Sequence, residues 1–258
     1  MTHRRTAWPD NDKEEKTVKL ICCPYAGAHV NVFTGLHKQI RARLPDLGLL
    51  AVEYAGHGRR LSEPALESIA EQAADLLARL EPELDPDEEL ILLGYSMGSL
   101  IVYELAQLLK QRGFRIGKLI FMAATPPHRV RVSEEDLEED EALLEHCRVY
   151  GLIKEHQFDS PQMRRLFLPA LRSDIAAVGR YNITNGYRCR RFPAEVEVAV
   201  FQGRSDRSVT APEDWKDVTE GELARYDYPG GHFFLYECQE EVVSDLLLFI
   251  QGSKRPAI

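Results

Sequence analysis

Residues 89–106 read ELILLGYSMGSLIVYELA, and this stretch decides the fold. The run Glu89–Leu93 has the length and composition of a buried strand, and Leu100–Ala106 continues as a helix. Between them, Gly94–Gly98 fits the G-x-S-x-G pattern of a tight turn from strand to helix. Such a turn exposes a serine hydroxyl, and its glycines remove Cβ atoms that would clash. We therefore interpret Ser96 as a candidate nucleophile; the alternative is an ordinary serine in a glycine turn.

Short apolar runs alternate with segments of helical periodicity on both sides of this motif. The alternation predicts an α/β fold, with a mainly parallel sheet and helices on both of its faces. The expected strands are Val18–Cys23, Leu49–Val52, Leu90–Leu93, Leu119–Ala124, Val196–Phe201 and Leu223–Tyr228. The expected helices are Val30–Leu44, Leu66–Leu80, Met97–Arg112 and Glu240–Gln251.

One stretch interrupts the alternation. Residues 126–193 contain no convincing strand, and a gap of roughly 65 residues is too long for a plain loop. The segment Ser133–Asp136 has the pattern of a capping box, and apolar positions follow at helical spacing. We therefore expect a helical insertion at one edge of the sheet. Residues 1–16 are polar and are expected to form a disordered tail, which leaves residues 17–258 as one domain.

Composition excludes several classes of function. The chain has 258 residues, 32 Lys and Arg against 41 Asp and Glu, and a formal net charge of −9. Excess basic residues are the basis of phosphate affinity, so we expect no binding to nucleic acid or to an anionic membrane.

The five cysteines have no C-x-x-C spacing, which favours reduced thiols and a cytoplasmic location. No apolar run approaches the roughly 18 residues of a membrane helix. The histidines are scattered, so no metal or cofactor site is expected.

A nucleophilic serine needs a general base and a group that orients the base. His232 follows Gly230 and Gly231, between the last predicted strand and the last predicted helix. Asp206 follows the fifth predicted strand. The chain order Ser96, Asp206, His232 is that of the α/β-hydrolases, so we predict these residues as a catalytic triad. The alternatives are a structural histidine and an aspartate that caps a turn.

Acyl chemistry also needs N–H donors directed at the oxyanion that forms during the reaction. One expected donor is the backbone N–H of Met97, the first residue of the predicted helix. The other is expected from the loop Pro24–Ala28, whose small residues let backbone amides approach a substrate. The alternative for this loop is an ordinary glycine turn.

Six motifs in order make the chain resemble a known family, the type II thioesterases that accompany polyketide synthases and nonribosomal peptide synthetases. The resemblance extends from Leu20 to Phe249. The motifs are Pro24–Ala28, Tyr54–Arg60 with Leu61 and Pro64, Gly94–Gly98, Leu171–Asp174 with Tyr181, Asp206 with Val209 and Trp215, and Gly230–Leu235. The sequence departs from the family pattern at Ala28, His57 and Gly58.

This resemblance implies an α/β-hydrolase fold and a serine thioesterase. Its substrates would be acyl or aminoacyl thioesters on the phosphopantetheine arms of carrier proteins, and its role would be to edit stalled or mis-primed synthases. It assigns Ser96, Asp206 and His232 to the triad, suggests Ala26 and Met97 as the oxyanion amides, and makes the insertion a lid. The phosphopantetheine belongs to the partner protein, so the enzyme itself needs no cofactor.

Two other functions are compatible with the same residues. One is a carboxylesterase, lipase or peptidase that uses the same triad, and the other is a non-catalytic ligand-binding protein on the α/β-hydrolase fold. For the thioesterase we expect a monomer that docks carrier proteins through a local basic patch, because both partners are acidic overall. The candidates for this patch are Arg59, Arg60, Arg164, Arg165, Arg188, Arg190 and Arg191. The alternative, which we favour for most of them, is a set of ordinary solvated arginines.

Overall fold

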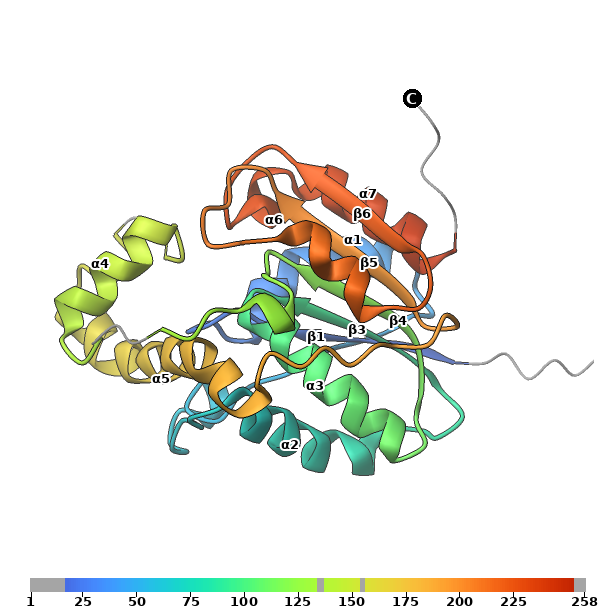
Figure 1. Cartoon of the computed structure of the whole chain (residues 1–258), viewed down its shortest axis with the longest axis horizontal. Coiled ribbons are helices and arrows are strands. Elements are labelled where there is room, and N and C mark those ends of the chain that lie inside the picture. Colours follow the sequence, from blue (N-terminus) through green and yellow to red (C-terminus); the bar gives the residue numbers. More distant parts are fainter. Residues whose placement is uncertain (1–16, 134–136, 154–155, 253–258) are drawn as a thin grey trace, which may run out of the picture.

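The computed structural model describes residues 17–133, 137–153 and 156–252. Its centre is a six-stranded sheet in the order β2-β1-β3-β4-β5-β6, in which all neighbouring strands run parallel. The predicted α/β fold with a parallel sheet is therefore confirmed (Figure 1). The strands are β1 (Val18–Cys23), β2 (Gly48–Ala51), β3 (Glu89–Tyr95), β4 (Arg115–Met122), β5 (Glu197–Gly203) and β6 (Leu223–Tyr228).

Helices cover both faces of the sheet and create two separate apolar cores. On one face lie α1 (Thr34–Arg43), α6 (Phe234–Glu237) and α7 (Gln239–Ile250). On the other lie α2 (Ile69–Leu80) and α3 (Met97–Gln111). Successive side chains of a strand point to opposite faces, so both faces of β1 and β3 are buried. This explains why Leu20–Cys23 and Leu90–Leu93 within them are continuously apolar rather than alternating.

The strand order reverses between β1 and β3. From β1 the chain moves to β2 on one side, whereas β3 to β6 extend on the other. Ligands of open α/β sheets bind outside the carboxyl ends of the strands at such a reversal. Here those ends carry the loop Pro24–Ala28 and Ser96. The topology thus brings together the two segments that the sequence predicted as parts of a site.

In its described residues, the segment between β4 and β5 contains helices joined by loops and no strand beyond the single bridge of Phe192 to Thr219. It contains η4 (Pro127–Arg129), α4 (Asp140–Tyr150) and α5 (Pro161–Asn185), and α4 projects away from the sheet (Figure 1). α4 and α5 share a small apolar core of their own, formed by Leu143, Leu144, Cys147, Phe158, Leu168 and Leu171. The predicted capping box includes residues 134–136, which lie outside the described residues, as does the predicted tail 1–16; α4 begins at Asp140.

Several boundaries differ from the predicted ones for identifiable reasons. The predicted helix from Val30 begins as a 3₁₀ turn, η1 (Val30–Phe33), before α1. The predicted helix from Leu66 begins at Ile69, because Ser68 caps it: its hydroxyl accepts from the Glu71 N–H at 3.2 Å. β4 ends at Met122, because Ala123 has a φ of 49°.

The remaining short elements are η2 (Gly58–Arg60), η3 (Glu81–Glu83) and η5 (Pro212–Val218). None of the helices in the described ranges combines the length and apolarity needed to cross a membrane.

Candidate active site

Ser96 occupies a strained turn between β3 and α3. Its φ of 55° and ψ of −118° lie outside the regions that non-glycine residues usually adopt. The turn is held by a hydrogen bond from the Ser96 N–H to the Met122 carbonyl, at 2.8 Å. A Cβ at Gly94 would collide with the Gly98 backbone, and a Cβ at Gly98 would collide with the Cys23 carbonyl. The two glycines of the motif are therefore required by close approach of the backbone.

His232 and Asp206 form a buried pair at the adjacent strand ends. The Asp206 Oδ2 atom lies 2.8 Å from His232 Nδ1, and the two side chains are 0% and 2% exposed. Asp206 comes from the loop after β5, and His232 comes from the loop between β6 and α6. The Tyr95 hydroxyl, next to Ser96, donates to the His232 carbonyl at 2.5 Å. Because Nδ1 faces Asp206, Nε2 is the ring nitrogen that remains for a proton-transfer partner.

Ser208 also forms hydrogen bonds with this pair, and the sequence had not indicated this role. Its N–H and its hydroxyl donate to Asp206 Oδ1 at 2.9 and 2.6 Å, and its Oγ also lies 3.0 Å from His232 Nδ1. Burial opposes the charge on Asp206, but the hydrogen bonds from His232 and Ser208 outweigh it, so the pKa of Asp206 is lowered. The available signal was a serine two residues after an aspartate in a turn, which is typical of an Asx-turn.

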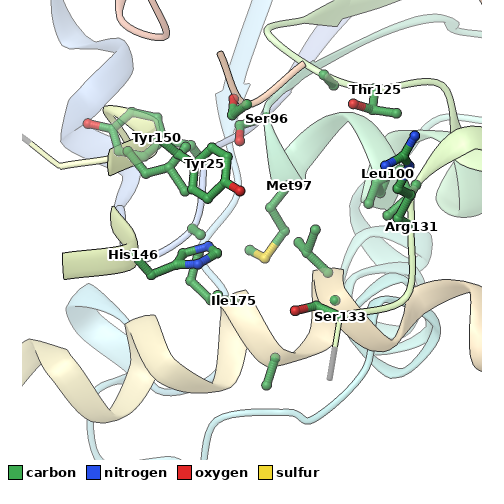
Figure 2. Close-up of a pocket in the computed structure, with 18 of the residues that line it drawn as sticks. Tyr25, Ser96, Met97, Leu100, Thr125, Arg131, Ser133, His146, Tyr150 and Ile175 are labelled. Atoms are coloured by element: carbon green, nitrogen blue, oxygen red, sulfur yellow. The ribbon is translucent and has the colours of Figure 1, made fainter. Parts of the chain in front are cut away.

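Ser96 and His232 line one cavity with a volume of about 990 Å³. Ala26 and Met97, the residues suggested for the oxyanion amides, line the same cavity. Figure 2 shows Tyr25, His146 and Tyr150 on one side of it and Thr125 and Arg131 on the other. α5 and α4 close it opposite the sheet, so the insertion supplies much of its wall.

The two suggested amides occupy positions suited to donation. Met97 is the first residue of α3, where a helix leaves its N–H groups without partners inside the helix. The Ala26 N–H has no hydrogen-bond partner in the described part of the chain. Both groups are therefore available to an oxygen atom bound in the cavity beside Ser96.

Asp174 holds the Ala26 loop in place, and the sequence analysis had not given it this role. This fully buried side chain of α5 accepts hydrogen bonds from the Gly27 N–H at 2.7 Å and from Gln72 Nε2 at 3.3 Å. His57 Nε2 lies 2.9 Å from the same carboxylate, and its Nδ1 lies 2.9 Å from the Ala55 carbonyl. One carboxylate thus ties the insertion to the loop that follows β1. The motif around it was visible in the sequence, but its partners are distant along the chain.

The described residues contain one cluster of side chains that could bind a metal ion. Ligand atoms of His128, Asp214 and Asp217 lie within 4.8 Å of one another. However, Asp214 forms an ion pair with Arg129 at 2.6 Å, and His128 lies 3.3 Å from Asp217. Arg129 thus already engages the Asp214 carboxylate, whereas both ring nitrogens of His128 are buried and make no hydrogen bond with any described residue.

Most arginines of the predicted basic patch are engaged within the chain. Arg59 pairs with Glu53, Arg60 with Glu63 and Asp75, Arg164 with Glu141, and Arg190 with Glu104. Arg188 and Arg191 donate to backbone carbonyls. The pairing with carboxylates reduces the local positive charge on which the predicted patch depended.

Comparison with known proteins places the chain in a family. The family model of the thioesterase domain matches residues 18–249. The chain belongs to the thioesterase family. It is 30% identical over 244 residues to Thioesterase PikA5 of Streptomyces venezuelae, covering 92% of this chain and 83% of that protein. It is 26% identical over 230 residues to the gramicidin S biosynthesis protein GrsT of Aneurinibacillus migulanus, covering 88% and 86%.

Solved structures give the same assignment. The type II thioesterase BorB from the borrelidin biosynthetic cluster superposes with a TM-score of 0.76 at 28% identity, covering 94% of both chains. The thioesterase RedJ from the prodiginine pathway of Streptomyces coelicolor also has a TM-score of 0.76 and 28% identity, covering 94% and 90%. The predicted fold, hydrolase class and family are thus confirmed, and the chain is a hydrolase of thioesters.

We expect the buried His57–Asp174 pair to make the stability of this thioesterase depend on pH. Burial disfavours the charged imidazole, but the hydrogen bond and the charge of Asp174, helped by Glu53, outweigh it and raise the pKa of His57. A raised pKa means that the folded state favours the protonated ring. Its stabilising contribution is therefore complete below the ordinary pKa of about 6.5 and is lost as the pH rises through the raised value.

We expect His57→Gln to reduce the free energy of unfolding more at about pH 6 than at about pH 9. Urea unfolding of both proteins at the two pH values measures this difference. In an Asp174→Asn background the pH dependence of the effect should disappear, because the charge that raises the pKa is gone. A loss of stability of equal size at both pH values would contradict the raised pKa of His57.

Proposed function

We propose that this thioesterase removes acyl or aminoacyl groups from the phosphopantetheine arms of carrier proteins, and so edits stalled or mis-primed polyketide or nonribosomal peptide synthases. The observation that carries the proposal is that Ser96 and His232 line one cavity of about 990 Å³, and that His232 is held from behind by the buried Asp206. Relatives named for polyketide and peptide-antibiotic pathways support the choice of substrate class. We further propose that it acts in the cytoplasm as a monomer without a cofactor of its own.

In the proposed mechanism, Ser96 Oγ attacks the carbonyl carbon of the thioester. His232 Nε2 accepts the proton of the hydroxyl, while Asp206 holds Nδ1 and stabilises the imidazolium that forms. The lowered pKa of Asp206 keeps this carboxylate ionised at neutral pH. The C–S bond then breaks, the thiolate leaves and accepts the proton, and the acyl group remains on Ser96 as an ester.

The backbone amides of Ala26 and Met97 would stabilise the negative oxygen of the tetrahedral intermediate. Such preorganised donors act most strongly where water is excluded, and one of them contributes about 10²- to 10³-fold in kcat in a related chemistry. Asp174 would maintain this arrangement, because it holds the Gly27 N–H directly beside Ala26.

Hydrolysis of the acyl-enzyme would complete the cycle. His232 removes a proton from a water molecule, the hydroxide attacks the ester carbonyl, and Ser96 leaves with the proton. The same base thus serves both halves of the reaction. The helical insertion, for which we predict the bounds 126–193, would act as a lid over the acyl group in both steps.

The decisive experiment offers the enzyme a panel of carrier proteins loaded with different acyl and aminoacyl groups, together with matched oxygen esters. Mass spectrometry identifies the released acids. We expect release from the carriers with a higher kcat/KM than from the oxygen esters. A consistent preference for oxygen esters would instead favour a carboxylesterase, and failure of active-site serine probes to label the protein would favour a non-catalytic binding protein.

Ser208→Ala should lower kcat about tenfold with little change in KM, because one hydrogen bond to a charged group is lost from a pair that binds no substrate directly. Steady-state kinetics on one acyl-carrier substrate measures the effect. Ser62→Ala, at an exposed position outside the cavity, is the matched control. A change confined to KM would show that Ser208 acts on substrate binding instead.

A further inference from the structure

Three exposed arginines border the active-site cavity and come from three different segments. Arg131 follows η4, Arg180 belongs to α5, and Arg207 precedes Ser208 in the loop after β5. We call these three residues the arginine rim. Figure 2 shows Arg131 beside Thr125 at the edge of the cavity that also holds Ser96.

Within the described residues, the arginine rim has no internal partner, unlike Arg172 on the same cavity wall. Among the described residues, no carboxylate or carbonyl forms an ion pair or hydrogen bond with Arg131, Arg180 or Arg207. Arg172, which lines the same cavity, donates to the Leu137 carbonyl and to Asp140. No group in the described part of the chain engages the donors of the three rim guanidiniums, which leaves them to a ligand.

The charge of the whole chain makes this grouping informative. The net charge is −9, and an anionic substrate is repelled by such a protein unless positive charge is concentrated where it binds. Three arginines without a carboxylate partner among the described residues border one opening, and Glu138 is the one described carboxylate on the same lining, so positive charge predominates there. Guanidinium groups are also the side chains best matched to phosphate oxygens, because they donate two parallel hydrogen bonds.

The position of the rim indicates which part of a substrate it meets. The inner wall of the cavity is apolar and includes Leu100, Ile175 and Val178, which suits an acyl chain. The arginines are exposed, so they face the part of the substrate that remains near solvent once the thioester has reached Ser96. In a carrier-bound substrate this part is the pantetheine arm and the phosphate that joins it to the protein.

We propose that the arginine rim is a phosphate-binding site that recognises the phosphate of the phosphopantetheine arm. The inference rests on the proposed function, and it names the group by which the enzyme distinguishes a phosphorylated arm from a simple thioester. Two other anions have related chemistry: a carboxylate at the far end of the acyl group, and acidic side chains of the carrier protein. The test is arranged to separate all three.

The experiment measures kcat/KM for one neutral acyl group presented as acyl-pantetheine, as acyl-phosphopantetheine and on the intact carrier protein. Malonyl-pantetheine, which carries a carboxylate on its acyl group, is measured beside them. The variants are Arg131→Ala, Arg180→Ala, Arg207→Ala and the triple substitution. We expect each single change to lower kcat/KM about fivefold, and the triple change about 100-fold, for both phosphate-containing substrates. Acyl-pantetheine should be hydrolysed equally by all variants, which also shows that they are folded. Arg41→Ala, an exposed arginine of α1 outside the cavity, is the matched control.

The results that overturn the inference are distinct from those that overturn the proposed function. Equal losses of kcat/KM on acyl-pantetheine and acyl-phosphopantetheine would show that the arginines do not bind the phosphate. A loss on the carrier protein alone would assign the arginines to the carrier surface. A loss that appears only with malonyl-pantetheine would assign them to an acyl carboxylate. If the wild type releases nothing from any loaded carrier, it is the proposed function that fails.

Discussion

Ser96→Ala should lower the release of acyl groups by about 10⁴- to 10⁶-fold, because loss of the nucleophile removes the covalent route and leaves only binding and oxyanion stabilisation. The substitution deletes one hydroxyl from a turn whose strain is borne by the backbone, so the fold should be retained. Single-turnover release of a radiolabelled acyl group from carrier protein measures the effect over this range.

Two controls make the result for Ser96 specific. A fluorophosphonate probe should label the wild type and Ser62→Ala, whose serine is exposed outside the cavity, but should not label Ser96→Ala. If Ser96→Ala retained more than about a tenth of the wild-type rate, Ser96 would not be the nucleophile, since nucleophile losses in serine hydrolases are far larger.

Asp174→Asn is expected to have the second largest effect, on both stability and catalysis. The change keeps the shape of the side chain but replaces one accepting oxygen with a donor, so at least one of its buried partners, Gly27, His57 or Gln72, is left unsatisfied. Disrupting such a buried charged pair costs about 3 kcal/mol. Misplacement of the Ala26 amide should also lower kcat about 100-fold while KM changes little.

Urea unfolding and steady-state kinetics on the same preparation test both parts of this prediction. Asp159→Asn is the matched control, because Asp159 lies in the same insertion but is exposed and, among the described residues, forms its ion pair with the exposed His156. A variant that was destabilised but had an unchanged kcat would limit Asp174 to a structural role. A variant with unchanged stability would contradict the claim that the buried hydrogen bonds of Asp174 stabilise the fold.

The sequence allowed prediction of the features that are determined by residues close together along the chain. The strand-to-helix turn around Ser96 was readable because steric limits on the backbone require Gly94 and Gly98 within five residues. The strands were readable because helices bury both faces of the sheet, which leaves uninterrupted apolar runs. Asp206 and His232 followed from chain order and from their places after predicted strands, and the structure brings them to 2.8 Å.

Features that depend on distant contacts were not predicted. Asp174 meets Gly27 across 147 residues and His57 across 117, and no local pattern encodes either distance. The same limit applied to the arginines. Composition and spacing did not reveal that Arg60 and Arg190 have carboxylate partners, whereas Arg131 and Arg207 have none in the described part of the chain.

The hydrogen bonds of Asp174 constrain how the insertion moves. Beyond Asp174, α5 is also fastened by Tyr181, which donates to Glu104 at 2.6 Å, and by Asn182, which donates to the carbonyls of Pro127 and Val130. Pro169 lies inside α5 before these contacts, where the absence of its N–H interrupts the helical hydrogen bonds. Any opening that preserves these contacts must therefore take place upstream of Asp174, where Pro169 weakens the helix. We therefore expect the α4 end of the insertion, and not the end beside Ala26, to adapt to acyl groups of different length.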